Sequence, residues 1–291
     1  MIDLHSHTKY SDGADEVCDL LKKAENLNLK VLSVTDHNTC LEYGELNNPE
    51  TRKIFSGKIL TGVELNTKVN SHPIEILGYN IDTDKMQELI EKTYVSQEER
   101  CKIEAERLYK KCIEAGVNLP EDFIENYDGS MFVSEYLHKF IEEDEHNRSL
   151  FDEDAVKTTG IFYRKYMSNP SSKFFVNMDD CLPDFETAAN IVREAGGMVF
   201  LPHIYEYREH SMDILDYILK NYKIDGIECY YRNFEEWQTE FLLNKCKEYD
   251  LYVSGGSDYH GIAHPGVELG TGEGKLSVPD DIINDWAKKF I

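Results

Sequence analysis

The sequence lacks long hydrophobic runs: no stretch of apolar residues approaches the roughly 20 that a membrane-spanning helix requires. Its first residues, Met-Ile-Asp-Leu-His, also lack the basic and apolar segments of a secretory signal. A membrane partner is therefore not expected, and we predict a protein of the cytoplasm.

Cysteine pairs with metal-binding spacing are missing too. The seven cysteines are scattered along the chain, and no two of them form a C-x-x-C motif. A disulfide framework or a zinc site built from thiolates is therefore not expected. Reduced thiols, as in cytosolic proteins, are the simpler interpretation.

Basic residues are scarce. The chain has 31 Lys and Arg against 55 Asp and Glu, which gives a formal net charge of −24. A surface of that sign repels phosphate backbones, so a long nucleic-acid duplex is not an expected partner. A short nucleotide or an oligonucleotide end remains compatible, because bound metal ions can reverse the potential inside a site.

Strand-like runs alternate with helical runs in residues 1–83 and again in 167–291. The expected strands cover 2–7, 30–35, 58–65, 73–79, 197–202, 225–231 and 251–255. The expected helices cover 14–27, 185–195, 212–221 and 235–249, with a terminal helix at 280–290. Short strands that alternate with helices predict an α/β domain with parallel strands.

Residues 84–166 interrupt this alternation. They predict one long helix over 85–115 that ends at Gly116, a second helix over 131–141, and an acidic solvated loop over 142–154. We therefore expect a helical insertion or cap at 84–166 within a domain formed by 1–83 and 167–291.

Polar residues follow the expected strands at the points where these end. Because the carboxyl ends of parallel strands meet at one edge of a sheet or barrel, these side chains should converge there. The residues concerned are His5, His7, Asp36, His37, Glu64, His203, Glu228, Asp258 and His260.

His5 and His7 lie two residues apart in a strand, so both side chains point to the same face. A lone histidine is more often a satisfied polar residue than a ligand. Five histidines and four carboxylates at strand ends are harder to explain in that way, because each buried one would need a partner. Imidazole and carboxylate donors without thiolates suit Zn²⁺, Mn²⁺ or Fe²⁺. The pattern therefore predicts a site for several metal ions.

The remaining histidines do not join this pattern. His138 and His146 belong to the helical, acidic stretch and are expected to face solvent. His210 and His264 follow candidate ligands in loops, and we expect them beside the ligands or at the surface.

Six short motifs occur in order between residues 3 and 261. They are Asp-Leu-His-Ser-His-Thr at 3–8, Ser-Asp-Gly at 11–13, Thr-Asp-His-Asn-Thr at 35–39, Gly-Val-Glu at 62–64, Pro-His at 202–203, and Gly-Gly-Ser-Asp-Tyr-His-Gly at 255–261. Together they resemble the motifs of the PHP (polymerase and histidinol phosphatase) superfamily. The resemblance spans nearly the whole chain except the helical insertion.

This resemblance implies a distorted (β/α)7 barrel with two or three divalent ions at its C-terminal rim. Mn, Fe or Zn is expected, and Mg is also compatible. The implied ligands of one ion are His5, His7, Glu64 and Asp258. A second ion would be bound by Asp12, His37 and His260, and these three are also the implied catalytic residues. A third ion would be shared by Glu64, His203 and one more residue. Many relatives have a histidine at the position of Glu75, so here the last ligand would be either Glu75 itself or His72, three residues earlier.

The resemblance further implies a metal-dependent phosphoesterase that attacks its substrate with a metal-activated hydroxide. A small nucleotide-like ester is expected, such as a nucleoside 3′,5′-bisphosphate or an oligonucleotide end. Arg100, Arg208 and Arg232 are the candidates to hold the phosphate oxygens. Each of them could equally pair with the abundant surface carboxylates. Asp36 and Glu228 could orient ligand imidazoles or be ordinary strand-end residues.

Two alternatives stay open. One is a histidinol-phosphate phosphatase, which would use the same chemistry on another substrate. The other is a non-catalytic interaction module with a structural metal site. The intact set of ligands and the absence of an attached polymerase domain argue against this module. The sequence does not predict an oligomeric state.

Overall fold

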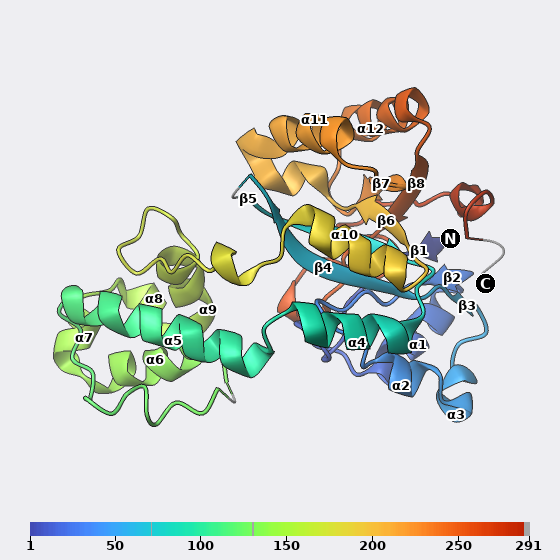
Figure 1. The fold of residues 1–291 in the computed structure, drawn as a ribbon. Helices are drawn as coiled ribbons and strands as arrows, with labels where there is room; N and C mark the ends of the chain where they lie inside the picture. Colours follow the sequence, from blue (N-terminus) through green and yellow to red (C-terminus); the bar gives the residue numbers. More distant parts are fainter. Residues whose placement is uncertain (71, 130, 288–291) are drawn as a thin grey trace. The chain divides into compact units, whose positions relative to one another are not determined.

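The computed structural model describes residues 1–70, 72–129 and 131–287. The chain divides into two compact units (Figure 1). The first unit consists of Met1–Thr93 and Leu182–Ile291, and the second consists of Tyr94–Cys181. The second unit overlaps the helical segment expected at 84–166, but residues 84–93 belong to the first unit and residues 167–181 to the second.

The first unit contains two sheets. A parallel three-stranded sheet has the order β1 (Ile2–Asp3), β2 (Val31–Leu32) and β3 (Lys58–Ile59). A five-stranded sheet has the order β4 (Gly62–Val69), β5 (His72–Tyr79), β6 (Met198–Leu201), β7 (Gly226–Tyr231) and β8 (Tyr252–Gly256). The single strand expected at 58–65 is therefore two strands in different sheets.

The direction of β5 differs from the expected all-parallel arrangement. β5 runs antiparallel to both β4 and β6. Val69 pairs with His72, so only two residues connect β4 to β5, and Asn70 adopts a positive φ of 47° there. A connection this short can form only a hairpin, because a parallel pair needs a long crossover. The first residues of β5 consequently lie at the same edge as the carboxyl ends of the other strands.

Backbone hydrogen bonds link the two sheets at both sides. The Leu4 N–H donates to the Gly255 carbonyl oxygen at 3.2 Å, and the Glu64 N–H donates to the Thr35 carbonyl oxygen at 3.1 Å. Parallel bridges accompany these bonds, one between Ser6 and Tyr259 and one between His37 and Glu64. Segments that are far apart in sequence are thereby brought to one rim.

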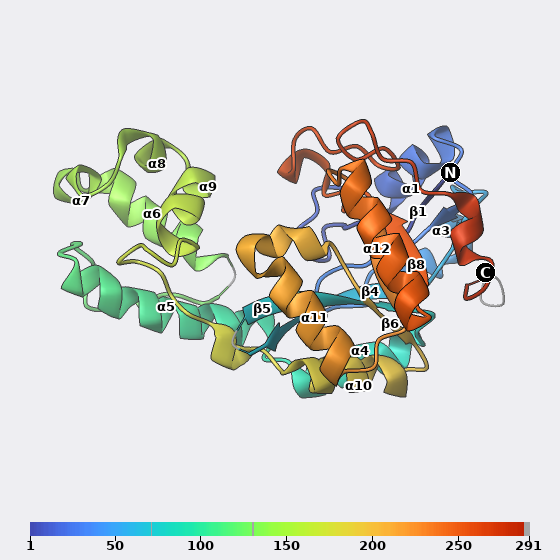
Figure 2. The same cartoon turned by 90° about the horizontal axis from the view of Figure 1, so that it is seen from above.

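Helices cover the sheets of the first unit. α10 packs against β4, β5 and β6, and α12 packs against β7 and β8 (Figure 2). The expected terminal helix is only a short 3-10 turn at Asp280–Ile283 followed by turns up to residue 287, and its last residues lie outside the described part. The helices of this unit are α1 (Val17–Asn26), α2 (Tyr43–Leu46), α3 (Pro49–Arg52), α4 (Thr83–Thr93), α10 (Phe185–Glu194), α11 (Ser211–Asn221) and α12 (Glu236–Tyr249).

The core of the first unit is apolar and aromatic. Tyr79, Phe200 and Trp286 pack together, with ring centroids 4.7 to 5.4 Å apart. The Tyr79 hydroxyl donates to the Leu4 carbonyl oxygen at 2.8 Å, which satisfies this buried polar atom and ties β5 to the segment after β1. This core thereby holds β5 and the segment after β1 in fixed positions beneath the residues at the carboxyl ends of the strands.

The second unit is helical and has its own apolar core, which includes Phe123, Phe162 and Phe174. The long helix expected at 85–115 is broken, because the Ser96 hydroxyl accepts the Glu99 N–H at 3.1 Å and caps a new helix. The helices of this unit are α5 (Gln97–Glu114), α6 (Val133–Glu143), α7 (Glu145–Ser149), α8 (Glu153–Lys157) and α9 (Thr159–Phe162).

Two further expectations for this segment were wrong. The acidic stretch 142–154 is largely helical, because the Asp144 carboxylate accepts the Asn147 N–H at 2.8 Å and caps α7. His138 is only 4% exposed, and its Nε2 bonds to the Ala155 carbonyl oxygen at 3.0 Å.

In neither unit does a described helix have the length and apolarity needed to cross a membrane.

Candidate metal centre

The histidines that follow β1 lie fully buried against two carboxylates. His5 Nε2 is 3.1 Å from Glu64 Oε2 and 3.4 Å from Asp258 Oδ1. His7 Nε2 is 3.2 Å from both of these oxygens. Because residues two apart in an extended chain share a face, both rings reach the same point. His5, His7, Glu64 and Asp258 therefore form a first group that could hold one ion.

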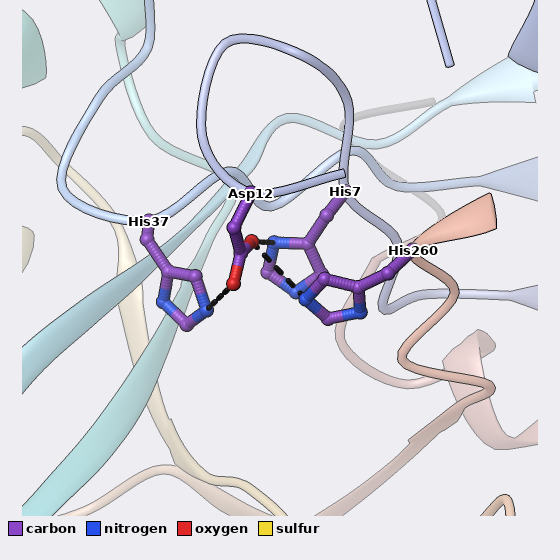
Figure 3. Close-up of side chains that lie close together, drawn as sticks. All are labelled: His7, Asp12, His37 and His260. Carbon is purple, nitrogen blue, oxygen red and sulfur yellow. Dashed lines mark ion pairs between the residues drawn. The ribbon is translucent and has the colours of Figure 1, made fainter. Parts of the chain in front are cut away.

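A second group lies at the more open side of the rim (Figure 3). The Asp12 carboxylate is 3.1 Å from His260 Nε2, 3.8 Å from His37 Nε2 and 3.9 Å from His7 Nδ1. The Asp12 side chain is 50% exposed, whereas His7 is fully buried. The structure thus brings together Asp12, His37 and His260, as the resemblance implied, and it adds His7 as a member shared with the first group.

The third group contains Glu64, Glu75 and His203. His203 Nε2 is 2.9 Å from Glu64 Oε1 and 3.5 Å from Glu75 Oε2. Leu77 pairs with Glu64 across the hairpin, so Glu75, two residues before Leu77, faces the same side as Glu64.

His72 is placed elsewhere by the same alternation. It lies three residues before Glu75 in β5, so it points to the opposite face of the sheet. There its ring lies beside that of His210, with the ring centroids 4.4 Å apart. Of the two residues considered for the third group, the structure brings only Glu75 to the centre.

Glu228 supports two of these groups. Its Oε1 accepts a hydrogen bond from His5 Nδ1 at 3.1 Å, and its Oε2 accepts the His203 N–H at 2.9 Å. A proton on Nδ1 leaves the lone pair of His5 Nε2 directed at the centre. Glu228 is thus placed to orient an imidazole, which was one of the two interpretations of this residue.

Asp36 acts on the loop that carries Asp12. Its carboxylate accepts the Thr8 N–H at 2.7 Å and the hydroxyls of Thr8 and Ser11. Among the described residues, Asp36 makes no hydrogen bond to an imidazole. Of its two interpretations, the orienting of a ligand histidine is therefore not seen, and Asp36 instead fixes the turn that precedes Asp12.

The charges of the centre hold Glu64 and Asp258 ionised, whereas burial raises the pKa of Glu75. Burial opposes the charged forms, but His5 nevertheless holds the pKa values of Glu64 and Asp258 well below their usual range. Although burial lowers the pKa of His7, the Asp258 and Glu64 carboxylates 3.2 Å away raise it to about 10. Although burial also lowers the pKa of His203, its bond to Glu64 raises it to about 9. Glu64 and Asp258 therefore favour positive charge beside them, which protonated imidazoles carry in the metal-free protein.

Several buried donor atoms in the centre have no hydrogen-bond partner in the described structure: both ring nitrogens of His7, and Nδ1 of His37 and of His203. Buried polar atoms are normally satisfied, and unsatisfied ones cost free energy. Coordination of divalent ions would satisfy such atoms in His7 and His37, and the imidazole and carboxylate donors suit such ions. In His203 the nitrogen that faces the carboxylates is Nε2 rather than the unpartnered Nδ1. The residues present therefore fit a centre of two or three divalent ions.

Backbone strain is concentrated at two of these residues. His203 and Asp258 adopt positive φ values of 23° and 52°. Residues other than glycine rarely adopt this region, and the strain persists only where the surrounding structure imposes it. At Asp258 the Tyr231 hydroxyl provides such a restraint, because it donates to Asp258 Oδ2 at 2.7 Å.

The three candidate arginines are placed differently. Arg232 is 14% exposed, and its Nη1 lies 3.1 Å from Asp258 Oδ2 and 3.2 Å from His264 Nδ1. Arg208 is exposed at a kink in the 3-10 segment Ile204–His210 and makes no ion pair with any residue that the structure describes. Arg100 belongs to α5 of the second unit, so its role toward a phosphate remains a prediction. Only Arg232 is seen at the centre.

The sequence placed His264 either beside the ligands or at the surface, and it did not reveal Tyr231 as a member of this neighbourhood. The His264 ring stacks on that of His260, with centroids 4.3 Å apart, and it also meets Arg232. Tyr231 ends a buried strand and resembles an ordinary core aromatic in the sequence. A bulge at Cys229 shifts the register of β7, so Tyr231 reaches the same site as Glu228 although the two lie three residues apart.

Comparison with known proteins identifies the family. The model of the PHP domain matches residues 3–158, which is more than half of the chain. The chain belongs to the PHP domain family, as its motifs predicted.

Named relatives align over almost the whole chain. A 5′-3′ exoribonuclease from Haemophilus influenzae is 27% identical and covers 98% of both chains. A 3′,5′-nucleoside bisphosphate phosphatase from Chromobacterium violaceum is 24% identical over 92% of this chain and 90% of its own. Both names describe hydrolases of phosphoric esters, and the class of enzyme predicted from the sequence agrees with them.

A solved structure supports the fold. A protein from Bifidobacterium adolescentis, named as a metal-dependent phosphoesterase, superposes with a TM-score of 0.69 at 20% identity, covering 98% of this chain and 94% of that one. The mixed α/β fold expected from the sequence is therefore confirmed.

Proposed function

We propose that this protein is a metal-dependent phosphoesterase that hydrolyses a small nucleotide-like phosphate ester. The observation that carries the proposal is the row of three adjoining histidine and carboxylate groups, buried at Glu64 and open to solvent at Asp12. Nucleoside 3′,5′-bisphosphates and oligonucleotide ends are the proposed substrates, and the names of the two relatives support this choice.

We assign the ligands by group. The first group would hold a buried ion, and the second group would hold an ion on the open side through Asp12, His37 and His260. The third group would hold a further ion through Glu64, Glu75 and His203. Divalent ions bound there would supply an activated water and neutralise charge on the phosphate oxygens. Mn, Fe, Zn and Mg are all compatible with these donors.

The residues at the open side would position the substrate. Asp12 and His37 are partly exposed there, and the Arg232 guanidinium lies next to Asp258. The Arg232 Nε is buried without a hydrogen-bond partner in the described structure. Arginine suits phosphate oxygens because its planar donors match them in pairs. We propose that Arg232 binds an oxygen of the phosphate while Tyr231 keeps Asp258 in place.

The (β/α)7 barrel is part of the same proposal. β1, β2 and the strands β4 to β8 are joined to their neighbours by strand pairing or by the linking hydrogen bonds near Leu4 and Glu64. A ring of seven strands would place all three groups at the C-terminal rim of one barrel.

The location of the protein in the cytoplasm also remains a prediction.

A substrate panel tests the proposed function. Metal-free protein is loaded separately with Mn²⁺, Fe²⁺, Zn²⁺ or Mg²⁺, and product release is measured with nucleoside 3′,5′-bisphosphates, 5′-phosphorylated oligoribonucleotides and histidinol phosphate. We expect turnover of a nucleotide ester by the wild type and at least a hundredfold loss in His37→Ala. Preference for histidinol phosphate would support the first alternative. Fewer than two ions per chain, with no turnover, would support the non-catalytic module.

A further inference from the structure

An aromatic side chain stands exposed on the rim of the first unit. Trp237 is 58% exposed in the first turn of α12, the helix that follows β7. Its Nε1–H donates to Glu235 Oε2 at 2.9 Å, so its polar atom is satisfied while much of its ring faces solvent. The only other tryptophan of the chain, Trp286, is buried at 2% exposure. A large aromatic ring gives a wide apolar contact area, so the exposed face of Trp237 can bind another flat group.

A continuous row of aromatic rings joins Trp237 to the candidate metal centre. Tyr231 lies 5.4 Å from His203 between ring centroids, and Phe234 lies 5.1 Å from Tyr231. Tyr205 lies 5.1 Å from Phe234 and 5.7 Å from Trp237. We call Tyr231, Phe234, Tyr205 and Trp237 the aromatic row.

The aromatic row starts at the centre and ends at the surface. Tyr231 is buried, Phe234 and Tyr205 are half-buried, and Trp237 is exposed. Tyr205 follows the carboxyl end of β6, and the other three residues end or follow β7, so the row lies on the rim that carries the metal ligands. Tyr205 and Trp237 meet edge to face, which braces the exposed ring.

The charge around the exposed ring selects what can lie on it. Glu206 belongs to the 3-10 segment after β6, Glu235 caps α12 and Glu236 begins it. The Glu206 carboxylate accepts a hydrogen bond from Asn233 at 3.1 Å. Carboxylates repel a phosphate group, whereas an uncharged nucleobase is not repelled. One exposed ring is also far smaller than a stable protein interface. A base stacked on the ring fits these conditions.

We propose that Trp237 is a stacking platform for a nucleobase of a single-stranded oligonucleotide, and that this base lies beyond the nucleotide whose phosphate reacts. The inference rests on the proposed phosphoesterase function and narrows its substrate class from nucleotides to short oligonucleotides. Two further rings, Phe234 and Tyr205, separate Trp237 from Tyr231 at the centre, so a base stacked on Trp237 would belong to a nucleotide other than the reacting one. Stacking tolerates any base, so no sequence preference is expected.

Fluorescence provides a test that does not require turnover. A 5′-phosphorylated trinucleotide with phosphorothioate linkages is titrated into the metal-loaded protein, and its binding is followed independently by the anisotropy of a labelled copy. We expect saturable quenching of tryptophan emission in the wild type and none in Trp237→Phe, in which only the buried Trp286 emits. Binding of the trinucleotide without quenching in the wild type would overturn the proposal, as would absence of binding.

Kinetics with matched variants provide a second test. Trp237→Leu removes the π face but keeps an apolar side chain, and we expect it to raise KM for oligonucleotides about tenfold while KM for a nucleoside 3′,5′-bisphosphate changes less than about twofold. Trp237→Phe should keep most of the affinity. Tyr249→Ala, which removes an exposed aromatic at the far end of α12, should change neither value.

The outcomes separate this inference from the proposed function. Equal KM values for oligonucleotides in the wild type and Trp237→Leu would overturn the stacking platform while the phosphoesterase stands. Equal losses on oligonucleotide and bisphosphate would place Trp237 at the reacting nucleotide and also overturn it. If no ester turns over, the proposed function fails, and the quenching experiment alone decides whether Trp237 receives a base.

Discussion

Glu228 joins His5 to His203: one of its carboxylate oxygens accepts His5 Nδ1–H and the other accepts the His203 N–H. The two histidines belong to different groups of the centre, and their rings lie 5.5 Å apart between centroids. A single buried carboxylate therefore fixes the ring orientation of one candidate ligand and the backbone position of another.

Glu228→Gln tests this link. The amide can present its NH₂ group to His5 or His203, where a donor is already present, so one of the two bonds is weakened. We expect metal affinity or activity to fall by roughly 10- to 100-fold, as for other residues that orient metal-bound histidines. Metal titration by calorimetry measures the change. Glu248→Gln, which removes an exposed partner of Lys245, should have no effect, and equal affinities in both variants would refute the role of Glu228.

The third group makes a prediction about stoichiometry. Glu75→Ala should lower the metal content of the fully loaded protein by about one ion per chain, because His203 and Glu64 alone offer too few donors there. His72→Ala should leave the content unchanged, since its side chain lies on the other face of the sheet. Elemental analysis of both variants measures the count. A loss of one ion in His72→Ala would contradict the assignment.

The dependence of stability on pH should reverse when metal is removed. In the metal-free protein the pKa values of His7 and His203 are raised to about 10 and about 9, whereas unfolded histidine titrates near 6.5. Between those values the folded state binds more protons, so its free energy of unfolding falls as pH rises from about 6.5 to about 9–10. This stabilisation is fully present below about 6.5.

The metal-loaded protein should behave in the opposite way. Bound ions require unprotonated imidazoles, so below about 6.5 the unfolded state binds more protons and stability falls as pH falls. Melting temperatures measured with a chelator and with excess Mn²⁺ across this range provide the comparison. Parallel curves in the two conditions would show that these histidines do not bind the ions.

The arginines can be separated by substitution. Arg232→Gln should lower kcat/KM by roughly 10- to 100-fold, because it removes charged hydrogen bonds of about 1.5–3 kcal/mol at the centre. Arg208→Gln should reduce kcat/KM less, because its side chain is exposed and unpaired in the described structure. Steady-state kinetics on one nucleotide ester compare the two variants. A larger loss in Arg208→Gln would move the phosphate-binding role to the 3-10 segment.

The sequence predicted the parts of the site that depend on strand ends. The convergence of His5, His7, Glu64 and Asp258 on one rim was expected because they lie at or after the ends of the expected strands, and their grouping around one ion was implied by the PHP resemblance. In the structure Glu64 lies near the start of β4, because the strand expected at 58–65 is divided between two sheets. Glu75 could not be chosen over His72 in this way. The choice depends on two features of β5: its antiparallel direction, and its register with β4, which decides which alternate residues face the centre. The short connection at Asn70 determines both.

Bulges and loop contacts limited the prediction further. Glu228 and Tyr231 are three residues apart, so a regular strand would direct them to opposite faces, and the bulge at Cys229 brings both to the centre. The break between α4 and α5 followed from a cap at Ser96 within a stretch whose helical pattern continues. These features arise from local hydrogen bonds that residue patterns alone do not specify.

The short turn between β4 and β5 has a consequence for how such a centre can change. Inserting or deleting one residue there would slide β5 by one position, and Ile74 or Ile76 would then replace Glu75 opposite Asn66, on the face of the sheet that carries Glu64. Only a change of two residues keeps Glu75 on that face. The proposed capacity of the centre for a third ion is thus tied to the length of the connection between β4 and β5, so a change in that length would remove a candidate ligand from the centre without substituting it.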